Sequence, residues 1–285
     1  MSTLFLVATP IGNLEDISPR ALRVLSEVAL IAAEDTRHSR KLLTHFNITT
    51  PLTSYFDHNK TDKLREVLAR LDTGDVALIS DAGMPAINDP GYELVRAALD
   101  AGHEVSPIPG PSAPIAALAA SGLPTDSFTF LGYPPRKSKQ RLAHFEDVAA
   151  LPHTLLWLAS PHRLLACLTD MRAAFGDRQV AVAAELTKRF ERFFRGSLNE
   201  ALAFYADEPV RGEFTIVLAG AASEESAWTS AQVQAAIQSG LAGEQSTSQL
   251  ARQIASQSGW ARSEVYDLIQ QFRAQTSTPP TKHEQ

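Results

Sequence analysis

Short apolar runs alternate with amphipathic stretches over the first 120 residues, and this alternation constrains the fold more than any other feature of the sequence. Residues 60–72 carry Leu and Val at helical spacing, and Ser18 before Pro19 is typical of a helix start. The apolar runs predict strands at residues 4–8, 30–33, 76–79 and 104–108. Strands that alternate with helices predict an α/β domain with a mainly parallel sheet.

The same alternation restarts after residues 122–126, which have the composition of a linker. Further strands are expected at 128–130, 154–158, 180–183 and 214–218, with helices at 138–150 and 161–175 and from a capping box at 197–200. Beyond residue 223 the pattern is helical only and has the spacing of a helix-turn-helix, with Gly259 in the turn. We therefore predict two α/β domains at 1–121 and 122–222, a helix-turn-helix domain at 223–275 and a disordered tail at 276–285.

Bulk properties exclude several classes of protein. One cysteine allows no internal disulfide, and the eight histidines show no metal-ligand spacing, so no metal is expected. No apolar stretch reaches the ~20 residues of a membrane helix, and residues 1–7 lack the basic flank of a signal peptide. We expect a cytoplasmic protein that is not membrane-bound.

Three basic clusters interrupt a chain whose net charge is −6. The overall charge argues against nonspecific coating of nucleic acid, which needs a basic surface, but allows a local basic site. Taken singly, each cluster is expected to be a solvated face. The clusters are Arg37, His38, Arg40 and Lys41; Arg136, Lys137, Lys139 and Arg141; and Lys188, Arg189, Arg192 and Arg195.

Polar residues and Gly/Pro turns follow nearly every predicted strand. In open parallel sheets, ligands bind beyond the carboxyl ends of the strands, so these segments predict a cleft between the two α/β units. Each segment alone has an ordinary explanation as a turn or a helix start, and only their joint occurrence favours a site. The segments are residues 9–13, 34–37, 80–85, 109–113, 160–163 and 185–188.

Common catalytic fingerprints are absent from the sequence. It has no GxxxxGK[ST] phosphate loop, no GxGxxG after a strand, no HExxH and no GxSxG. Ordinary nucleotide-binding, Rossmann-type, zinc-protease and α/β-hydrolase sites are thereby excluded.

The ordered segments together resemble the ribosomal RNA cytidine 2′-O-methyltransferases of the tetrapyrrole-methylase superfamily. The resemblance covers about residues 3–221 and extends to the helical tail. It is carried by ATPIGNL (8–14), AEDTR (33–37), SDAG (80–83), NDPG (88–91), PGPSA (109–113), SPHR (160–163) and ELTK (185–188). Relatives that methylate tetrapyrrole precursors carry a Gly-rich first loop and a Tyr-Asp-Arg-type segment instead, so RNA is favoured over tetrapyrrole.

The resemblance implies a homodimer that binds S-adenosylmethionine (SAM) in the cleft and methylates 16S rRNA of the small ribosomal subunit, at a decoding-region cytidine. The implied SAM contacts are Asp81, Gly83, Met84, Pro85, Ile87, Ser112, Ala113, Leu158, Ala159, Phe214 and Thr215. Candidate RNA contacts are Arg37, His38, Arg136, Lys137, His162 and Arg163.

A positioned proton acceptor would help the ribose hydroxyl to attack. Lys188, with a pKa lowered by burial, and Glu34 are favoured over Asp35 and Asp81, although Lys188 and Glu34 are about as readily explained as residues that orient loops. The helical tail is expected either to hold RNA or to pack as a dimerisation module.

Three positions depart from the RNA group, since Ala159 and Leu131 stand where glutamate is common and Met84 replaces a frequent threonine. Two alternatives stay open, a tetrapyrrole-precursor methyltransferase and a catalytically inert nucleic-acid-binding relative, and Ala159 and Leu131 favour the second of these over the first.

Overall fold

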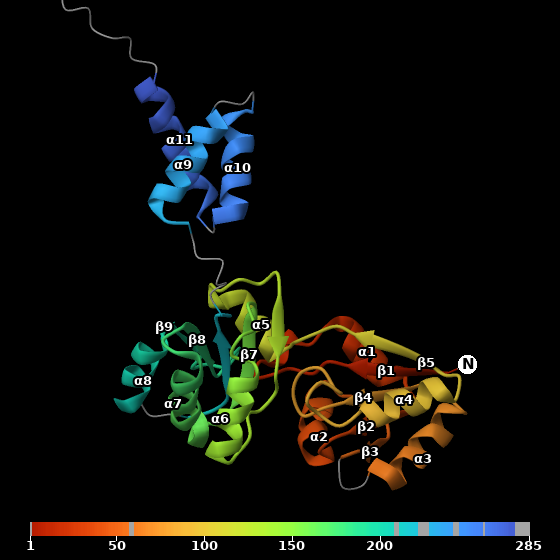
Figure 1. Cartoon of the computed structure of the whole chain (residues 1–285). Helices are drawn as coiled ribbons and strands as arrows, with labels where there is room; N and C mark the ends of the chain where they lie inside the picture. Colours follow the sequence, from red (N-terminus) through yellow and green to blue (C-terminus); the bar gives the residue numbers. More distant parts are fainter. Residues whose placement is uncertain are drawn as a thin grey trace, which may run out of the picture. The chain divides into compact units, whose positions relative to one another are not determined.

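The computed structural model describes residues 2–56, 60–207, 211–221, 228–241, 245–258 and 260–276. The chain divides into two compact units, Met1–Ala221 with both sheets and Ala222–Gln285 with helices (Figure 1). Two predictions lie outside the described residues: Gly259 in its turn, and all of the disordered tail but residue 276, which ends the last helix.

The first sheet is entirely parallel, in the order β3-β2-β4-β1-β5. This confirms the predicted α/β class for the first half of the chain. Strand β3 escaped prediction because its sequence, LTS, holds only one apolar residue and so shows no alternation. The strands are β1 (Thr3–Val7), β2 (Leu30–Ala33), β3 (Leu52–Ser54), β4 (Val76–Ile79) and β5 (Glu104–Ile108).

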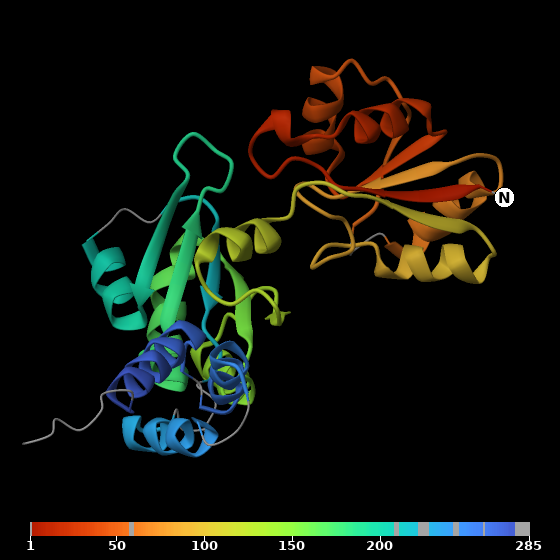
Figure 2. The same ribbon diagram turned by 90° about the horizontal axis from the view of Figure 1, so that it is seen from above.

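Helices cover both faces of this sheet (Figure 2). One face packs against α1 (Pro19–Glu27) and α2 (Thr36–His45), and the other against α3 (Lys60–Leu71) and α4 (Tyr92–Asp100). The Ser18 hydroxyl accepts the Ala21 amide at 3.1 Å, which confirms the predicted start of α1. The carboxyl ends of the strands are left uncovered for loops.

The second sheet is mixed, in the order β6-β7-β10-β8-β9. Strand β10 runs antiparallel to both neighbours, while β6 and β7 are parallel. The edge strand β9 escaped prediction because its arginines belong to a basic cluster rather than to an apolar run. The strands are β6 (Phe128–Phe130), β7 (Thr154–Ala159), β8 (Gln179–Ala184), β9 (Arg192–Ser197) and β10 (Phe214–Leu218).

Helices α6 (Ser138–Asp147), α7 (Leu164–Phe175) and α8 (Leu198–Asp207) cover one face of the second sheet. The other face packs against α5 (Ala113–Ser121), through Ala117 and Leu118. The sequence places residues 113–121 in the first domain, whereas this apolar contact attaches α5 to the second sheet. The capping box is confirmed, since the Ser197 amide donates to Glu200 at 2.7 Å and the Glu200 amide donates back to the Ser197 hydroxyl.

The regular elements among the described residues of the second compact unit are all helices: α9 (Ser230–Leu241), α10 (Thr247–Ser258) and α11 (Arg262–Thr276). They enclose a core of their own that includes Ile237, Leu250 and Ile269. In the part of the chain that the structure describes, no helix is long and apolar enough to cross a membrane.

One basic residue is not on a solvated face, contrary to the sequence analysis. The side chain of Arg141 is only 5% exposed and forms an ion pair at 2.7 Å with Asp170, which joins α6 to α7. Its guanidinium also donates to the carbonyls of Pro135 and Arg136. The segment that precedes α6 is thereby fixed from inside the protein.

Replacing Asp170 with alanine should lower the free energy of unfolding by about 3–5 kcal/mol, because it leaves a buried guanidinium without its counter-charge. Chemical denaturation followed by circular dichroism measures this loss. The control is Glu27→Ala, which breaks the exposed Arg23–Glu27 pair and should cost only about 0.3–0.5 kcal/mol. Equal, small losses in both variants would contradict the buried ion pair.

Candidate active site

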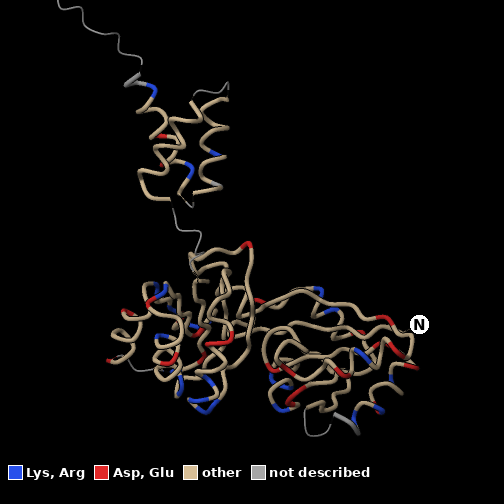
Figure 3. The backbone as a smooth tube through the Cα atoms, in the orientation of Figure 1, with Lys and Arg blue, Asp and Glu red and all other residues tan. Residues whose placement is uncertain are grey.

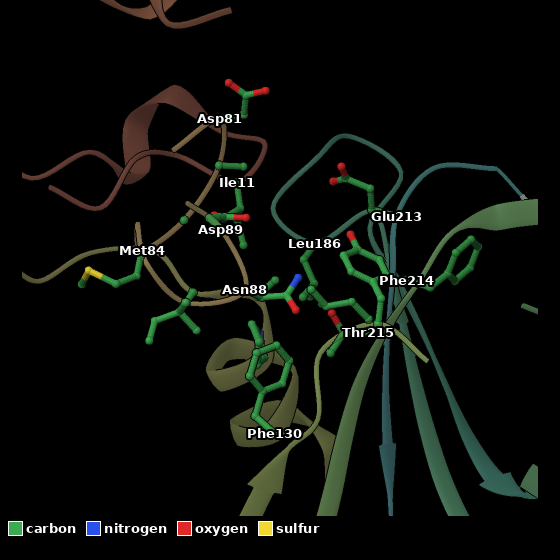
Figure 4. Close-up of a pocket in the computed structure, with 18 of the residues that line it drawn as sticks. Ile11, Asp81, Met84, Asn88, Asp89, Phe130, Leu186, Glu213, Phe214 and Thr215 are labelled. Carbon is green, nitrogen blue, oxygen red and sulfur yellow. The ribbon is translucent and has the colours of Figure 1, made fainter. Parts of the chain in front are cut away.

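A pocket lies where the carboxyl-end loops of the first sheet meet the second sheet (Figure 4). The pocket has a cavity volume of about 240 Å³ and is open to solvent on one side. Its lining comprises Ile11, Glu34, Asp81, Ala82, Gly83, Met84, Ile87, Asn88, Asp89, Ser112, Ala113, Pro114, Phe130, Tyr133, Leu158, Leu186, Glu213, Phe214 and Thr215.

The loop after β4 forms one wall and has an unusual backbone. Gly83 adopts φ +85° and exchanges two backbone hydrogen bonds with Thr9, at 2.9 and 3.0 Å. Ala86 and Asn88 hold positive φ values of 67° and 64°, which L-residues rarely adopt. Such strain persists only where surrounding structure enforces it, and it concentrates at ligand sites.

Hydrogen bonds between acidic residues join this loop to the loop after β2. The Glu34 carboxylate accepts the Asp81 amide at 3.3 Å, and the Asp81 carboxylate accepts the Asp35 amide at 3.2 Å. Asp35 in turn caps α2 and binds Arg37 through two side-chain hydrogen bonds. These bonds hold the pKa of Asp35 well below its usual range, so Asp35 is a poor proton acceptor.

The loop of residues 185–191 joins β8 to β9, and we call it the β8–β9 loop. It is also strained, with positive φ at Glu185 (52°) and Thr187 (63°). The ammonium group of Lys188 lies between Glu185, at 2.9 Å, and Glu213, at 3.1 Å. These contacts hold the loop against the pocket wall formed by Leu186 and Glu213.

The lowered pKa expected for Lys188 is not found. Burial alone would lower its pKa, but hydrogen bonds to Glu185 and Glu213 outweigh burial and raise the pKa above the usual lysine value. A lysine that keeps its proton cannot accept another, so the raised pKa argues against Lys188 as the proton acceptor, while its ammonium group contacts two carboxylates. Lys188 is also absent from the pocket lining.

Gly12 is a point where loops of the two sheets pack closely. A Cβ atom there would lie 3.0 Å from the Leu186 carbonyl oxygen and 2.9 Å from the Thr187 hydroxyl, and would overlap the Lys188 side chain. The neighbouring Ile11 packs in one apolar cluster with Leu186. The loop that follows β1, which holds Ile11 and Gly12, therefore sets the distance between the pocket walls.

The pocket is acidic. Four carboxylates line it, from Glu34, Asp81, Asp89 and Glu213, while its described lining includes no Lys, Arg or His. Burial raises the pKa of Asp89, and the negative charge of Asp81 raises it further. Such a pocket favours a cationic ligand and disfavours a phosphate-bearing one.

Most of the SAM contacts implied by the resemblance line this pocket. Pro85 and Ala159 do not. Pro85 is buried within its loop, and Ala159 lies in the core on the face of the second sheet that α6, α7 and α8 cover. Nine lining residues were missed. Five of them lie in motif segments and could have been found there: Ile11, Ala82, Asn88, Asp89 and Leu186. The other four lie in no motif: Pro114, Phe130, Tyr133 and Glu213.

The basic residues expected to bind RNA lie outside the described pocket lining. Arg37 and His38, in the first turn of α2, and Arg136 and Lys137, just before α6, are exposed. Figure 3 shows Lys and Arg positions at both α2 and α6. His162 is exposed in the turn before α7, where its neighbour Arg163 donates to the Ser160 hydroxyl at 3.1 Å and lies 6.0 Å from the Tyr133 ring centroid.

Comparison with known proteins identifies relatives along the whole chain. Residues 3–202 match the sequence model of the tetrapyrrole (corrin/porphyrin) methylases. A protein of Synechocystis sp. named ribosomal RNA small subunit methyltransferase I is 46% identical over 96% of this chain and 99% of its own. Proteins of the same name are 44% identical in Halalkalibacterium halodurans (94% of this chain, 95% of its own) and 51% identical in Pseudomonas aeruginosa (76% and 79%).

Solved structures share the fold at low sequence identity. A diphthine synthase matches with a TM-score of 0.58 at 15% identity, over 76% of this chain and 90% of its own. A uroporphyrin-III C-methyltransferase from Thermus thermophilus, in complex with S-adenosyl homocysteine, matches with 0.52 at 20%, over 76% and 97%. At these identities the likeness shows the fold alone.

Gly12→Ala should weaken SAM binding at least about tenfold, because its Cβ atom pushes the β8–β9 loop away from the pocket. Calorimetric titration measures the affinity. The control is Gly102→Ala, where φ is +83° and no atom lies within 4 Å of the added Cβ. It should lose about 1–2 kcal/mol of stability and keep its SAM affinity. Unchanged affinity in Gly12→Ala would show that this contact does not shape the pocket.

Proposed function

The chain belongs to the tetrapyrrole methylase family and, within it, to the group of ribosomal RNA small subunit methyltransferase I, and we propose that it methylates the ribose 2′-hydroxyl of a decoding-region cytidine in 16S rRNA, with SAM as methyl donor. The observation that supports ribosomal RNA as the substrate is the 46% identity to a relative of that name over nearly the full length of both chains. The choice of cytidine and of the 2′-hydroxyl rests on the resemblance of the sequence motifs.

The pocket residues fit SAM by their chemistry. Its sulfonium and ammonium groups are cationic, and the pocket presents four carboxylates. Apolar side chains such as Leu158, Leu186 and Phe214 offer surface for an adenine ring. We propose that the pocket holds SAM through Asp81, Gly83, Met84, Ile87, Ser112, Ala113, Leu158, Phe214 and Thr215.

When bound, SAM supplies a methyl group already activated by its positive sulfur, so the protein's main task is alignment. A ribose hydroxyl is a weak nucleophile at neutral pH, and a carboxylate that takes its proton assists attack. We assign this role to Glu34, which lines the pocket. Lys188 is a positioning residue that holds Glu213 at the pocket edge.

RNA requires the positive charge that the pocket lacks. We propose that its phosphates and sugars contact Arg37, His38, Arg136, Lys137, His162 and Arg163, outside the acidic lining. Cytoplasmic location, assembly as a homodimer and action on the small ribosomal subunit are further parts of the proposal, implied by the resemblance. Sedimentation of the purified chain tests the dimer.

Deleting the gene should abolish one ribose methylation at a cytidine in 16S rRNA, because the proposed enzyme alone supplies it. Ribose-methylation mapping in the deletion strain and in a strain complemented with the intact gene measures this loss. If the deletion strain kept every ribose methylation of its 16S rRNA, the proposed substrate would be wrong. Methyl transfer to a tetrapyrrole precursor, or none at all, would favour the alternative functions.

Glu34→Gln should lower kcat by roughly 10²- to 10⁴-fold, the usual contribution of a positioned proton acceptor. SAM affinity should change little, because the amide keeps an oxygen that can accept the Asp81 amide. The comparison variant is Lys188→Met, which should raise KM more than it lowers kcat. Near-normal turnover in Glu34→Gln, or a loss of kcat confined to Lys188→Met, would overturn the assignment.

A further inference from the structure

The β8–β9 loop presents an aromatic side chain to solvent. Phe190 is 74% exposed, although burying a phenylalanine ordinarily stabilises a protein by about 1.5–3 kcal/mol. The ring therefore contributes little to the core of its own chain. A single exposed ring is ordinary on a protein surface, so the groups around Phe190 decide whether it belongs to a binding site.

The loop that carries Phe190 is held in one conformation by its own contacts. The Glu191 carboxylate accepts the Thr187 amide at 2.6 Å, and Lys188 binds Glu185 and Glu213. Because the backbone is fixed on both sides of it, Phe190 is presented to solvent in advance of binding. A preorganised group loses less entropy when it binds.

Three arginines of the β8–β9 loop and strand β9 lie beside aromatic rings. The guanidinium of Arg189 lies 5.7 Å from the Phe190 ring centroid, that of Arg195 lies 4.5 Å from the Phe193 ring, and that of Arg192 lies 5.9 Å from Phe204. Rings that stack with bases, beside cations that attract phosphates, are the combination that binds single-stranded nucleic acid. In the sequence these arginines form a basic cluster, and their pairing with aromatic rings becomes visible only in the structure.

The loop also borders the acidic pocket, since its Leu186 lines the pocket together with Glu213. An RNA strand whose ribose reaches this pocket must therefore pass close to the loop. Strand β9 forms an edge of its sheet, so no further described strand covers it there.

We propose that Phe190 stacks with a base of the RNA substrate beside the methylated nucleotide while Arg189 contacts the strand's phosphates. This rests on the proposed function and adds a substrate-binding element to it. Stacking accepts any base, so the loop contributes affinity and alignment rather than sequence choice.

The test measures binding of a fluorescein-labelled 16S rRNA decoding-region fragment by the full chain loaded with S-adenosyl homocysteine, together with methyl transfer to that RNA. Phe190→Ala should weaken RNA binding roughly 5- to 150-fold, the range for loss of one stacked base. Phe190→Trp should restore it, and Arg189→Gln should flatten the salt dependence of binding. The matched control is Phe128→Ala, at the start of β6 on the other edge of the sheet, and it should bind normally.

Three outcomes would overturn the inference. Normal RNA binding by Phe190→Ala would show that the ring does not stack with a base. If the unaltered chain still transferred methyl groups to RNA, the proposed function would stand. Conversion of Phe190→Ala to a monomer in sedimentation would assign the ring to an interface between copies of this chain. No methyl transfer by the unaltered chain, either to the fragment or to small ribosomal subunits from the deletion strain, would overturn the proposed function and this inference with it.

Discussion

The close approach of the first-strand loop to both pocket walls is the constraint on which the site depends. Thr9 exchanges two backbone hydrogen bonds with Gly83, and three residues later Gly12 packs against the Leu186 carbonyl with no room for a side chain. One short segment thus fixes the loop after β4 and the β8–β9 loop relative to each other. Both loops also hold residues with positive φ values, and such strained backbone persists where its surroundings over-determine it.

A separation of charge follows from the same architecture. The carboxylates of Glu34, Asp81, Asp89 and Glu213 gather inside the pocket, while the exposed cations of α2 and of the segment before α6 stay outside its described lining. A cationic methyl donor and a polyanionic RNA have opposite electrostatic needs, and this arrangement serves both. It also accounts for a net charge of −6 in a chain proposed to act on RNA.

Much of this could be predicted from the sequence, because strand alternation and loop motifs are local signals. The parallel first sheet, the Ser18 and Ser197 helix starts and most of the pocket lining follow from them. Features set by tertiary contact could not be predicted. The ion pair that buries Arg141, the packing of α5 on the second sheet and the contact between Lys188 and Glu213 all depend on residues distant in sequence.

Calorimetric titration of the purified chain with SAM, alongside ATP, tests the central claim most directly. The account predicts that each chain binds one SAM, that S-adenosyl homocysteine competes for the same site, and that ATP does not bind because its phosphates are repelled by the pocket carboxylates. The absence of SAM binding, or binding of ATP in its place, would contradict a methyl-donor pocket between the two sheets.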